Sequence, residues 1–258
     1  MESVTEELRK EWAQKQLELQ SKLILEDTQA WQTKRITAEN DLGFPGEESL
    51  QYVGGVDISF IKDDNVNACA AFVVCRFPDM KVVHRDLSMV KLTKPYIAGF
   101  LAFREADFLI EKIEKLRRDN LKIFPQVVLV DGNGLLHPRE MGLACHMGVI
   151  LDMPFIGVAK NLLHVPGLQR DVEFKDKIKQ MERGGDSFEL VGQFNRVYGL
   201  ALRSCDDAPN PIYVSQGHRI SLETAKWVVM KCIKYRIPEP TRKADHFSRD
   251  FLREQGKR

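Results

Sequence analysis

Asp57 and Asp131 each interrupt an apolar part of the chain, and both could do chemistry as carboxylates. Asp57 stands within residues 53–60, which otherwise resemble a buried strand, and Asp131 ends the apolar run 126–130. A buried carboxylate is costly unless a cation or strong hydrogen-bond donors compensate it. Asp131 is predicted at the carboxyl end of a parallel strand, where α/β proteins place ligands. If the two strands are adjacent, the carboxylates need a shared cation.

Glu105 and Asp245 could complete a set of metal ligands. Each has a simpler interpretation as a surface ion pair, because basic residues adjoin both in the sequence. Asp57 alone could also be an edge-strand residue facing water, and Asp131 a turn or helix-cap residue. Together the four carboxylates predict a site for two Mg²⁺ ions, with Mn²⁺ as a substitute, since oxygen ligands suit these metals better than zinc. Two such cations can hydrolyse a phosphodiester in line.

Hydrophobic periodicity predicts the elements that must position these residues. Three strands come first, and their short loops allow only antiparallel hairpins; they span 52–60, 66–77 and 81–92. A helix at 99–118 carries Glu105. Strands at 127–130 and 155–158 flank a helix near 139–151 and predict a parallel pair. Further strands and helices are predicted at 197–203, 212–215, 221–236 and after Pro238.

This order of elements predicts an α/β fold of the ribonuclease H-like class, by fold-level analogy. Its mixed central sheet would have three antiparallel strands followed by parallel strands, flanked by helices. We expect one domain over residues 1–258, with an amphipathic helix at 6–25 and a connector at 40–46 within the N-terminal part, 1–46. The charged stretch 167–186 is predicted to be an insertion.

The composition is that of a globular protein, and it limits where the chain acts. No apolar run is long enough to span a membrane, and the N-terminus lacks the pattern of a secretory signal. We therefore expect a cytoplasmic protein, with the nucleus or nucleolus as a further compartment. Residues 217–258 hold eleven Lys and Arg against five Asp and Glu, which favours contact with phosphates or, equally, a solvated helical face.

Several long motifs in order, from about Tyr52 to His246, resemble the endonuclease V family. They are Gly54-Gly55-Val56-Asp57-Ile58-Ser59-Phe60, residues 95–105, residues 130–139, Gly157-Val158-Ala159-Lys160, residues 215–221 and residues 237–242. The resemblance implies a ribonuclease H-like enzyme that uses Mg²⁺ and cleaves strands at the second phosphodiester 3′ to inosine. It also implies that Asp57, Glu105 and Asp131 bind metal, with Asp245 at the late acidic position.

The same resemblance implies roles for residues around these carboxylates. His137 would lie near the metal water or the scissile phosphate, and Lys160 would contact phosphate or the attacking water; a loop-capping histidine and a solvated lysine are the alternatives. Tyr96 resembles the family's wedge, an aromatic side chain that enters where the modified base leaves the stack; the alternative is an amphipathic tyrosine between strand and helix. Substrate contacts are implied for Tyr96 with its neighbours and for the loop after Asp131: Pro95, Ile97, Gly132, Asn133, Gly134 and Leu135.

Ala98 and Asn133 depart from the common bacterial pattern, which has proline and histidine there, and both departures resemble animal members. Animal members favour inosine in RNA. The resemblance therefore implies an endoribonuclease that acts on single-stranded RNA, which we expect to be a monomer. The alternatives are a DNA-repair endonuclease acting on deoxyinosine and a non-catalytic nucleic-acid-binding protein.

Overall fold

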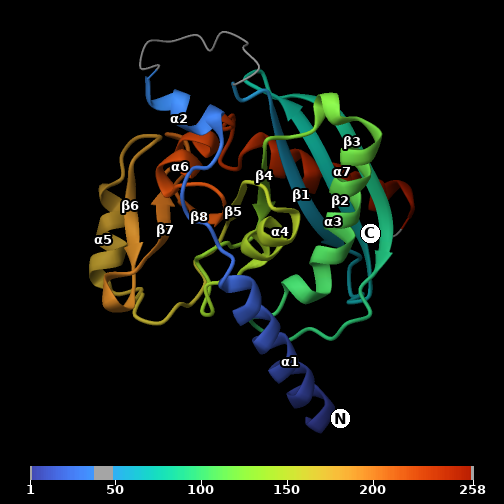
Figure 1. The fold of residues 1–258 in the computed structure, drawn as a ribbon. Helices are drawn as coiled ribbons and strands as arrows, with labels where there is room; N and C mark the ends of the chain where they lie inside the picture. Colours follow the sequence, from blue (N-terminus) through green and yellow to red (C-terminus); the bar gives the residue numbers. More distant parts are fainter. Residues whose placement is uncertain (1, 38–48, 257–258) are drawn as a thin grey trace.

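A single mixed sheet organises the chain (Figure 1). The structure is a computed structural model, which describes residues 2–37 and 49–256. Eight strands of the described residues pair in the order β3-β2-β1-β4-β5-β8-β7-β6. Their bounds are β1 Tyr52–Phe60, β2 Asn67–Arg76, β3 Lys81–Lys91, β4 Val127–Asp131, β5 Phe155–Ala159, β6 Ser187–Val191, β7 Val197–Leu202 and β8 Ile212–His218.

Helices cover both faces of the sheet (Figure 1). Apolar side chains of α3 and α4 pack on one face, and those of α6 and α7 pack on the other. The helices are α1 Glu2–Gln20, α2 Ala30–Thr37, α3 Ala102–Asp119, α4 Leu143–Leu151, α5 Val172–Gln180, α6 Leu222–Lys231 and α7 Glu239–Glu254. Among the described residues no helix combines the length and the apolar character that a membrane span requires.

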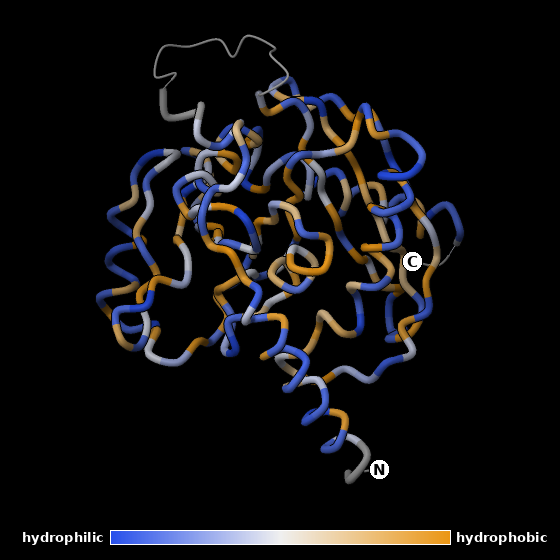
Figure 2. The backbone as a smooth tube through the Cα atoms, viewed as in Figure 1, coloured by the Kyte–Doolittle hydropathy of each residue, from blue (hydrophilic) through white to orange (hydrophobic). Residues whose placement is uncertain are grey.

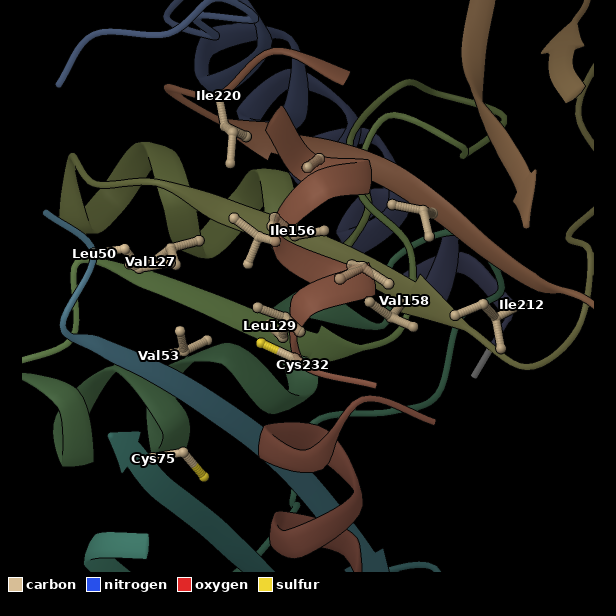
Figure 3. Packing of buried hydrophobic residues seen from close by; sticks show 14 of the residues in the cluster. Leu50, Val53, Cys75, Val127, Leu129, Ile156, Val158, Ile212, Ile220 and Cys232 are labelled. Carbon is tan, nitrogen blue, oxygen red and sulfur yellow. The ribbon is translucent and has the colours of Figure 1, made fainter. Parts of the chain in front are cut away.

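The core lies on either side of the central strands, because successive side chains of a strand point to opposite faces. Val53, Val127 and Leu129 pack with residues of α6, and Figure 3 shows part of this cluster between the sheet and the helix. Val56 and Val128 point to the opposite face of the sheet from Val53, Val127 and Leu129, and they pack under α3 and α4. In Figure 2 hydrophobic colouring is frequent along the central strands, whereas hydrophilic colouring is frequent on the outer helices.

The predicted mixed α/β fold is confirmed. The first three strands are antiparallel, β1, β4 and β5 are parallel, and β2 lies in the interior with both faces covered. Beyond β5, the strands β8, β7 and β6 run antiparallel, a direction that the prediction left unspecified. The predicted N-terminal helix begins earlier and ends at Gln20.

The elements α2 and β6 have no counterpart in the prediction. The stretch 167–186, expected as an insertion, contains α5 and leads directly into β6. In β6 only Leu190 is buried, although Phe188 and Val191 are also apolar. The predicted connector at 40–46 lies outside the described residues.

Candidate active site

The register of the parallel strands places Asp57 beside Asp131. Residues 53–56 of β1 pair one to one with residues 127–130 of β4, and the two aspartates come next on each strand. Neighbouring strands lie about 4.8 Å apart, and both aspartates share the alternation of Val53 and Leu129, which face α6. The side chains therefore project from adjacent positions on the same face. The edge-strand alternative for Asp57 is excluded, because β1 is central.

Lys160 follows the third parallel strand and joins the same face. It comes two residues after Val158, which packs on the α6 side of β5. Its Nζ lies 2.5 Å from Oδ2 of Asp131. The Arg236 guanidinium donates to the Lys160 carbonyl at 3.1 Å and so holds its backbone. The site thus takes one charged side chain from, or just beyond, each of three neighbouring parallel strands.

Helix α7 covers this face and adds two further groups to the site. The backbone of α7 approaches β1 closely at Gly55, where a β-carbon would lie 2.2 Å from the Pro240 carbonyl carbon. One turn and two turns further along, Asp245 and Ser248 come within reach of Asp57. The glycine of the motif therefore permits the helix contact that brings Asp245 to the cluster.

Glu105 reaches the cluster from the first turn of α3. Its side chain is 7% exposed, so the surface ion pair considered for it is not formed. The neighbouring Arg104 guanidinium instead donates to the carbonyl of Asn65. Burial raises the pKa of Glu105 to about 7, and the negative charges of Asp57 and Asp131 add to this shift. Sequence positions 57, 105, 131 and 245 therefore share one electrostatic environment.

The cluster has more negative charge than its surroundings compensate. Burial raises the pKa of Asp57 to about 6, and repulsion by Asp131 and Asp245 acts in the same direction. Asp131 pairs with Lys160, and Asp245 pairs with Arg249 at 2.7 Å. Within residues 2–37 and 49–256 no three His, Cys, Asp or Glu side chains are arranged to hold a metal ion as they stand. The donor chemistry nevertheless fits a hard divalent cation, because four carboxylates supply oxygen ligands and only two of them, Asp131 and Asp245, pair with a cationic side chain among the described residues.

His137 closes the loop after Asp131 and is a neutral, buried histidine. Its Nδ1 accepts a hydrogen bond from the Arg139 N–H at 3.2 Å. Burial lowers the pKa of His137 to about 4, and the charge of Arg139 adds to the effect. A neutral ring whose Nδ1 accepts must carry its proton on Nε2. His137 therefore caps its own loop and also has an N–H to donate.

The glycines of this loop serve two different purposes. A β-carbon on Gly134 would lie 2.1 Å from the Gln216 carbonyl oxygen, so this glycine permits contact with β8. A β-carbon on Gly132 would meet only Val130 Cγ1 at 3.7 Å and is sterically free. Asn133 holds the helix start, since its carbonyl accepts from Ala144 N–H at 3.1 Å, while its buried Oδ1 has no hydrogen-bond partner among the described residues.

Two residues expected to touch substrate are buried instead. Leu135 is 1% exposed in an apolar cluster, and its N–H donates to the Gln216 carbonyl. Ile97 is 4% exposed and packs with Trp12 and Phe100. Apolar packing thus occupies both side chains. Leu135 adjoins Gly134 and Ile97 adjoins Tyr96. Sequence position alone could not show whether such a neighbour contacts the substrate or packs in the core and holds the segment in place.

Tyr96 and Pro95 occupy the exposed part of the same segment. Tyr96 is 68% exposed, and Pro95 and Ala98 are also exposed, whereas Ile97 between them is buried. An aromatic ring left in water beside a buried anchor is available for stacking. The ring is therefore accessible to a nucleic acid, and its role as a wedge stays a prediction.

Within the basic C-terminal part, helix α7 pairs three of its four Lys and Arg side chains with its own carboxylates. Arg242 pairs with Glu239, Arg249 with Asp245, and Arg253 with Asp250. These pairs offset most of the positive charge of α7. The solvated-face interpretation therefore describes this helix better than a phosphate-binding surface.

Sequence reasoning missed Ser59 and Ser248. Both hydroxyls lie 3.0 Å from Oδ2 of Asp57 and 2.7 Å from each other. Ser59 follows Asp57 at the spacing that keeps a strand residue on the same face, which is a signal that could have identified it. Ser248 gives no such signal, because it comes 191 positions later.

The fold and the site define a class: a mixed α/β hydrolase with carboxylates clustered from its central strands and two flanking helices, the type of site that cleaves phosphodiesters. The sequence model of the endonuclease V family matches residues 32–246. Endonuclease V of Mus musculus is 49% identical over 94% of this chain and 69% of its own length. Endonuclease V of Homo sapiens is 48% identical over 94% of this chain and 82% of its own.

Solved structures agree with these relatives. The catalytic domain of human endonuclease V has a TM-score of 0.90 at 46% identity, covering 97% of this chain and 98% of that one. Endonuclease V of Ciona intestinalis, in complex with a 23mer DNA containing an inosine followed by a ribo-adenosine, has a TM-score of 0.83 at 35% identity, covering 96% and 98%. The chain belongs to the endonuclease V family and is a nuclease.

Proposed function

We propose that the chain is a Mg²⁺-dependent endonuclease that cleaves single-stranded RNA at the second phosphodiester 3′ to inosine. The observation that carries the proposal is the strand register that puts Asp57 beside Asp131, with Glu105 and Asp245 in the same electrostatic environment. A protein that only bound nucleic acid would gain nothing from negative charge concentrated near phosphate. The cluster therefore favours catalysis over binding alone.

Asp57, Glu105, Asp131 and Asp245 would hold the cations. The raised pKa values of Asp57 and Glu105 support this assignment, because they reflect buried negative charge that a divalent cation would compensate. When bound, two cations supply an activated water and stabilise the leaving oxygen of the phosphodiester. Mn²⁺ has similar oxygen-ligand preferences and should substitute.

Lys160 and His137 supply the nearby donors. The Lys160 side chain is about one-third exposed, so its ammonium already lies at the surface. It can leave Asp131 and bind a substrate phosphate with little further change in burial. His137 remains neutral at physiological pH and offers Nε2–H as a donor. Neither role requires a covalent intermediate with the protein.

Recognition of inosine would use the exposed Tyr96 and the free side of Gly132. Tyr96 can stack in the place of an extruded base, which offsets roughly 1–3 kcal/mol of the unstacking cost. Gly132 leaves space above its α-carbon, so a base can approach the main chain there. The Ciona intestinalis relative was solved with an inosine followed by a ribo-adenosine, which supports a substrate with ribose at that position for this chain.

Matched single strands carrying one inosine test the proposal. We would compare an all-RNA strand, an all-DNA strand and a DNA strand with one ribonucleotide 3′ to the inosine, each with Mg²⁺, with Mn²⁺ and with a chelator. The proposal predicts metal-dependent cutting of both strands that contain ribose. Equal or faster cutting of the all-DNA strand would favour the deoxyinosine alternative.

Variants separate catalysis from binding. Asp57→Ala and Asp131→Ala should lower cleavage at least about 100-fold while strand binding persists. Asp176→Ala is a matched control, because Asp176 is an aspartate on α5 that pairs with Lys179 of the same helix. Salt-sensitive binding with no turnover by the unsubstituted protein would support the non-catalytic alternative.

A further inference from the structure

Helix α1 touches two segments that the proposed function uses for different tasks. We call residues 95–100, which present Tyr96, the wedge segment, and residues 131–142, which begin at Asp131, the site loop. Figure 1 shows the N-terminal half of α1 projecting from the body while its C-terminal half reaches the domain. The family sequence model matches from residue 32 onward, so α1 precedes the matched residues.

Gln16 joins the two segments with a single buried side chain. Its amide Nε2 donates to the Gly99 carbonyl of the wedge segment at 3.0 Å and to the Met141 carbonyl of the site loop at 3.3 Å. Gln16 is 2% exposed. Both amide hydrogens are therefore committed, one to each segment.

Arg139 of the site loop fixes the other end of the Gln16 amide. Its Nε donates to Gln16 Oε1 at 2.5 Å, and its second guanidinium nitrogen donates to the Ala13 carbonyl at 3.2 Å. The guanidinium also lies over the ring of Phe100, 5.2 Å from its centroid. Arg139 thus ties the site loop to the helix and the wedge segment at once.

Apolar packing holds α1 in place beside these polar contacts. Trp12 stacks on Phe103 with ring centroids 4.9 Å apart, and it packs with Ile97 and Phe100 of the wedge segment. This cluster would dock the helix by itself. The buried amide of Gln16 therefore has a further effect, which is to set the spacing between the wedge segment and the site loop. The two segments approach each other closely, since His137 Cε1 lies 4.0 Å from a β-carbon built on Gly99.

We propose that Gln16 is a positioning residue that fixes the offset between the base-recognising wedge segment and the phosphodiester-cleaving site loop. The proposal rests on the proposed function, since it concerns which phosphodiester is cut. An enzyme that recognises one nucleotide and cuts at a fixed distance needs two rigidly related sites. Displacement of the scissile phosphate by on the order of 1 Å relative to the catalytic groups changes the cleavage rate on the order of 100-fold. A change of that size is enough to favour cleavage of a neighbouring phosphodiester.

Gln16→Glu tests this role without undocking the helix. The substitution keeps an oxygen acceptor for Arg139 and strengthens that contact with a charge, but it places a carboxylate oxygen against the Gly99 and Met141 carbonyls. Gln14→Glu is the matched control, because Gln14 is an exposed glutamine on the same helix. Gln16→Ala removes all three hydrogen bonds and provides a second variant.

The measurement is the distribution of cut positions on a single-stranded RNA with one inosine, resolved to the nucleotide, together with the melting temperature of each full-length variant. We expect Gln16→Glu to lower cutting at the wild-type position on the order of tenfold and to produce cuts at adjacent phosphodiesters. Gln14→Glu should cut as the wild type does.

Cutting by Gln16→Glu and Gln16→Ala at the wild-type position alone, at any rate, would overturn the proposal. A lower melting temperature of Gln16→Ala leaves the test intact. The cut positions of Gln16→Glu decide the outcome when its melting temperature is that of the wild type, and any residual product of either variant still reports the cut position. Failure of the proposed function is a distinct result, since the wild-type protein would then leave the inosine strand uncut.

Discussion

The hydroxyl of Ser248 on α7 lies 3.0 Å from Oδ2 of Asp57 on β1, which ties the last helix to the first strand at the carboxylate cluster. Ser59 contacts the same oxygen at 3.0 Å, and the two hydroxyls lie 2.7 Å apart. Two donors on one carboxylate oxygen fix the orientation of the group. The serines therefore hold Asp57 in place although burial and two neighbouring charges disfavour its ionised form.

Ser248→Ala should weaken both stability and cleavage. Ser248 is fully buried, and a hydrogen bond to a charged group contributes roughly 1.5–3 kcal/mol. We expect the free energy of unfolding in urea to fall by about 1–2 kcal/mol and single-turnover cleavage to fall about tenfold. The double variant with Ser59→Ala should lose less than the sum of the single losses, because the two hydroxyls share a partner. Strict additivity would contradict a shared role.

The carboxylate pair could be predicted from the sequence because local rules place it. Apolar runs predicted both strands, and the prediction that the two carboxylates lie close together followed from treating these strands as adjacent. Ser248 and Gln16 could not be found this way. Their partners lie 191 and 125 positions away, and only the packing of α7 and α1 brings them together.

The antiparallel end of the sheet escaped prediction for a similar reason. The order of β8, β7 and β6 depends on hairpin pairing that apolar patterns do not specify, and β6 buries only one side chain well. The roles of Gly134 and Leu135 were also hidden. Both serve contact with β8, a strand that begins 77 positions after Leu135.

Gly132→Ala and Gly134→Ala should separate substrate space from protein packing. A methyl group on Gly134 collides with the Gln216 carbonyl, so this variant should lose about 1–3 kcal/mol of stability. A methyl group on Gly132 meets only one atom at ordinary contact distance, so stability should change little while inosine-directed cleavage falls. Urea unfolding and cleavage assays measure the two effects. Wild-type cleavage by Gly132→Ala would remove Gly132 from the base-binding site.

Tyr96→Ala should reduce cleavage without affecting the fold. The ring is mostly exposed, so it contributes little to packing, and loss of base stacking costs roughly 1–3 kcal/mol of substrate interaction. This corresponds to a decrease of about 5- to 150-fold in kcat/KM. Tyr96→Phe should retain most activity because the aromatic face remains. Tyr235→Ala is the control, since Tyr235 is another exposed tyrosine, and an equal decrease there would contradict a specific role for Tyr96.

His146→Phe should make stability less sensitive to acid. His146 on α4 is 5% exposed, lies edge-on to Phe103, and has no hydrogen-bond partner for Nδ1 among the described residues. Burial lowers the pKa of His146 from 6.5 to about 4, so the folded state favours the neutral ring. The contribution of the neutral ring to the free energy of unfolding is therefore complete above pH 6.5 and is lost as the pH falls toward 4, by roughly 2 kcal/mol at pH 5.

Comparing the variant with the wild type by urea unfolding at pH 8 and pH 5 isolates the effect of His146, because the other titrating groups are common to both proteins. The difference in stability should shift by about 2 kcal/mol in favour of the variant at pH 5, and a difference independent of pH would show that His146 has a normal pKa in the fold.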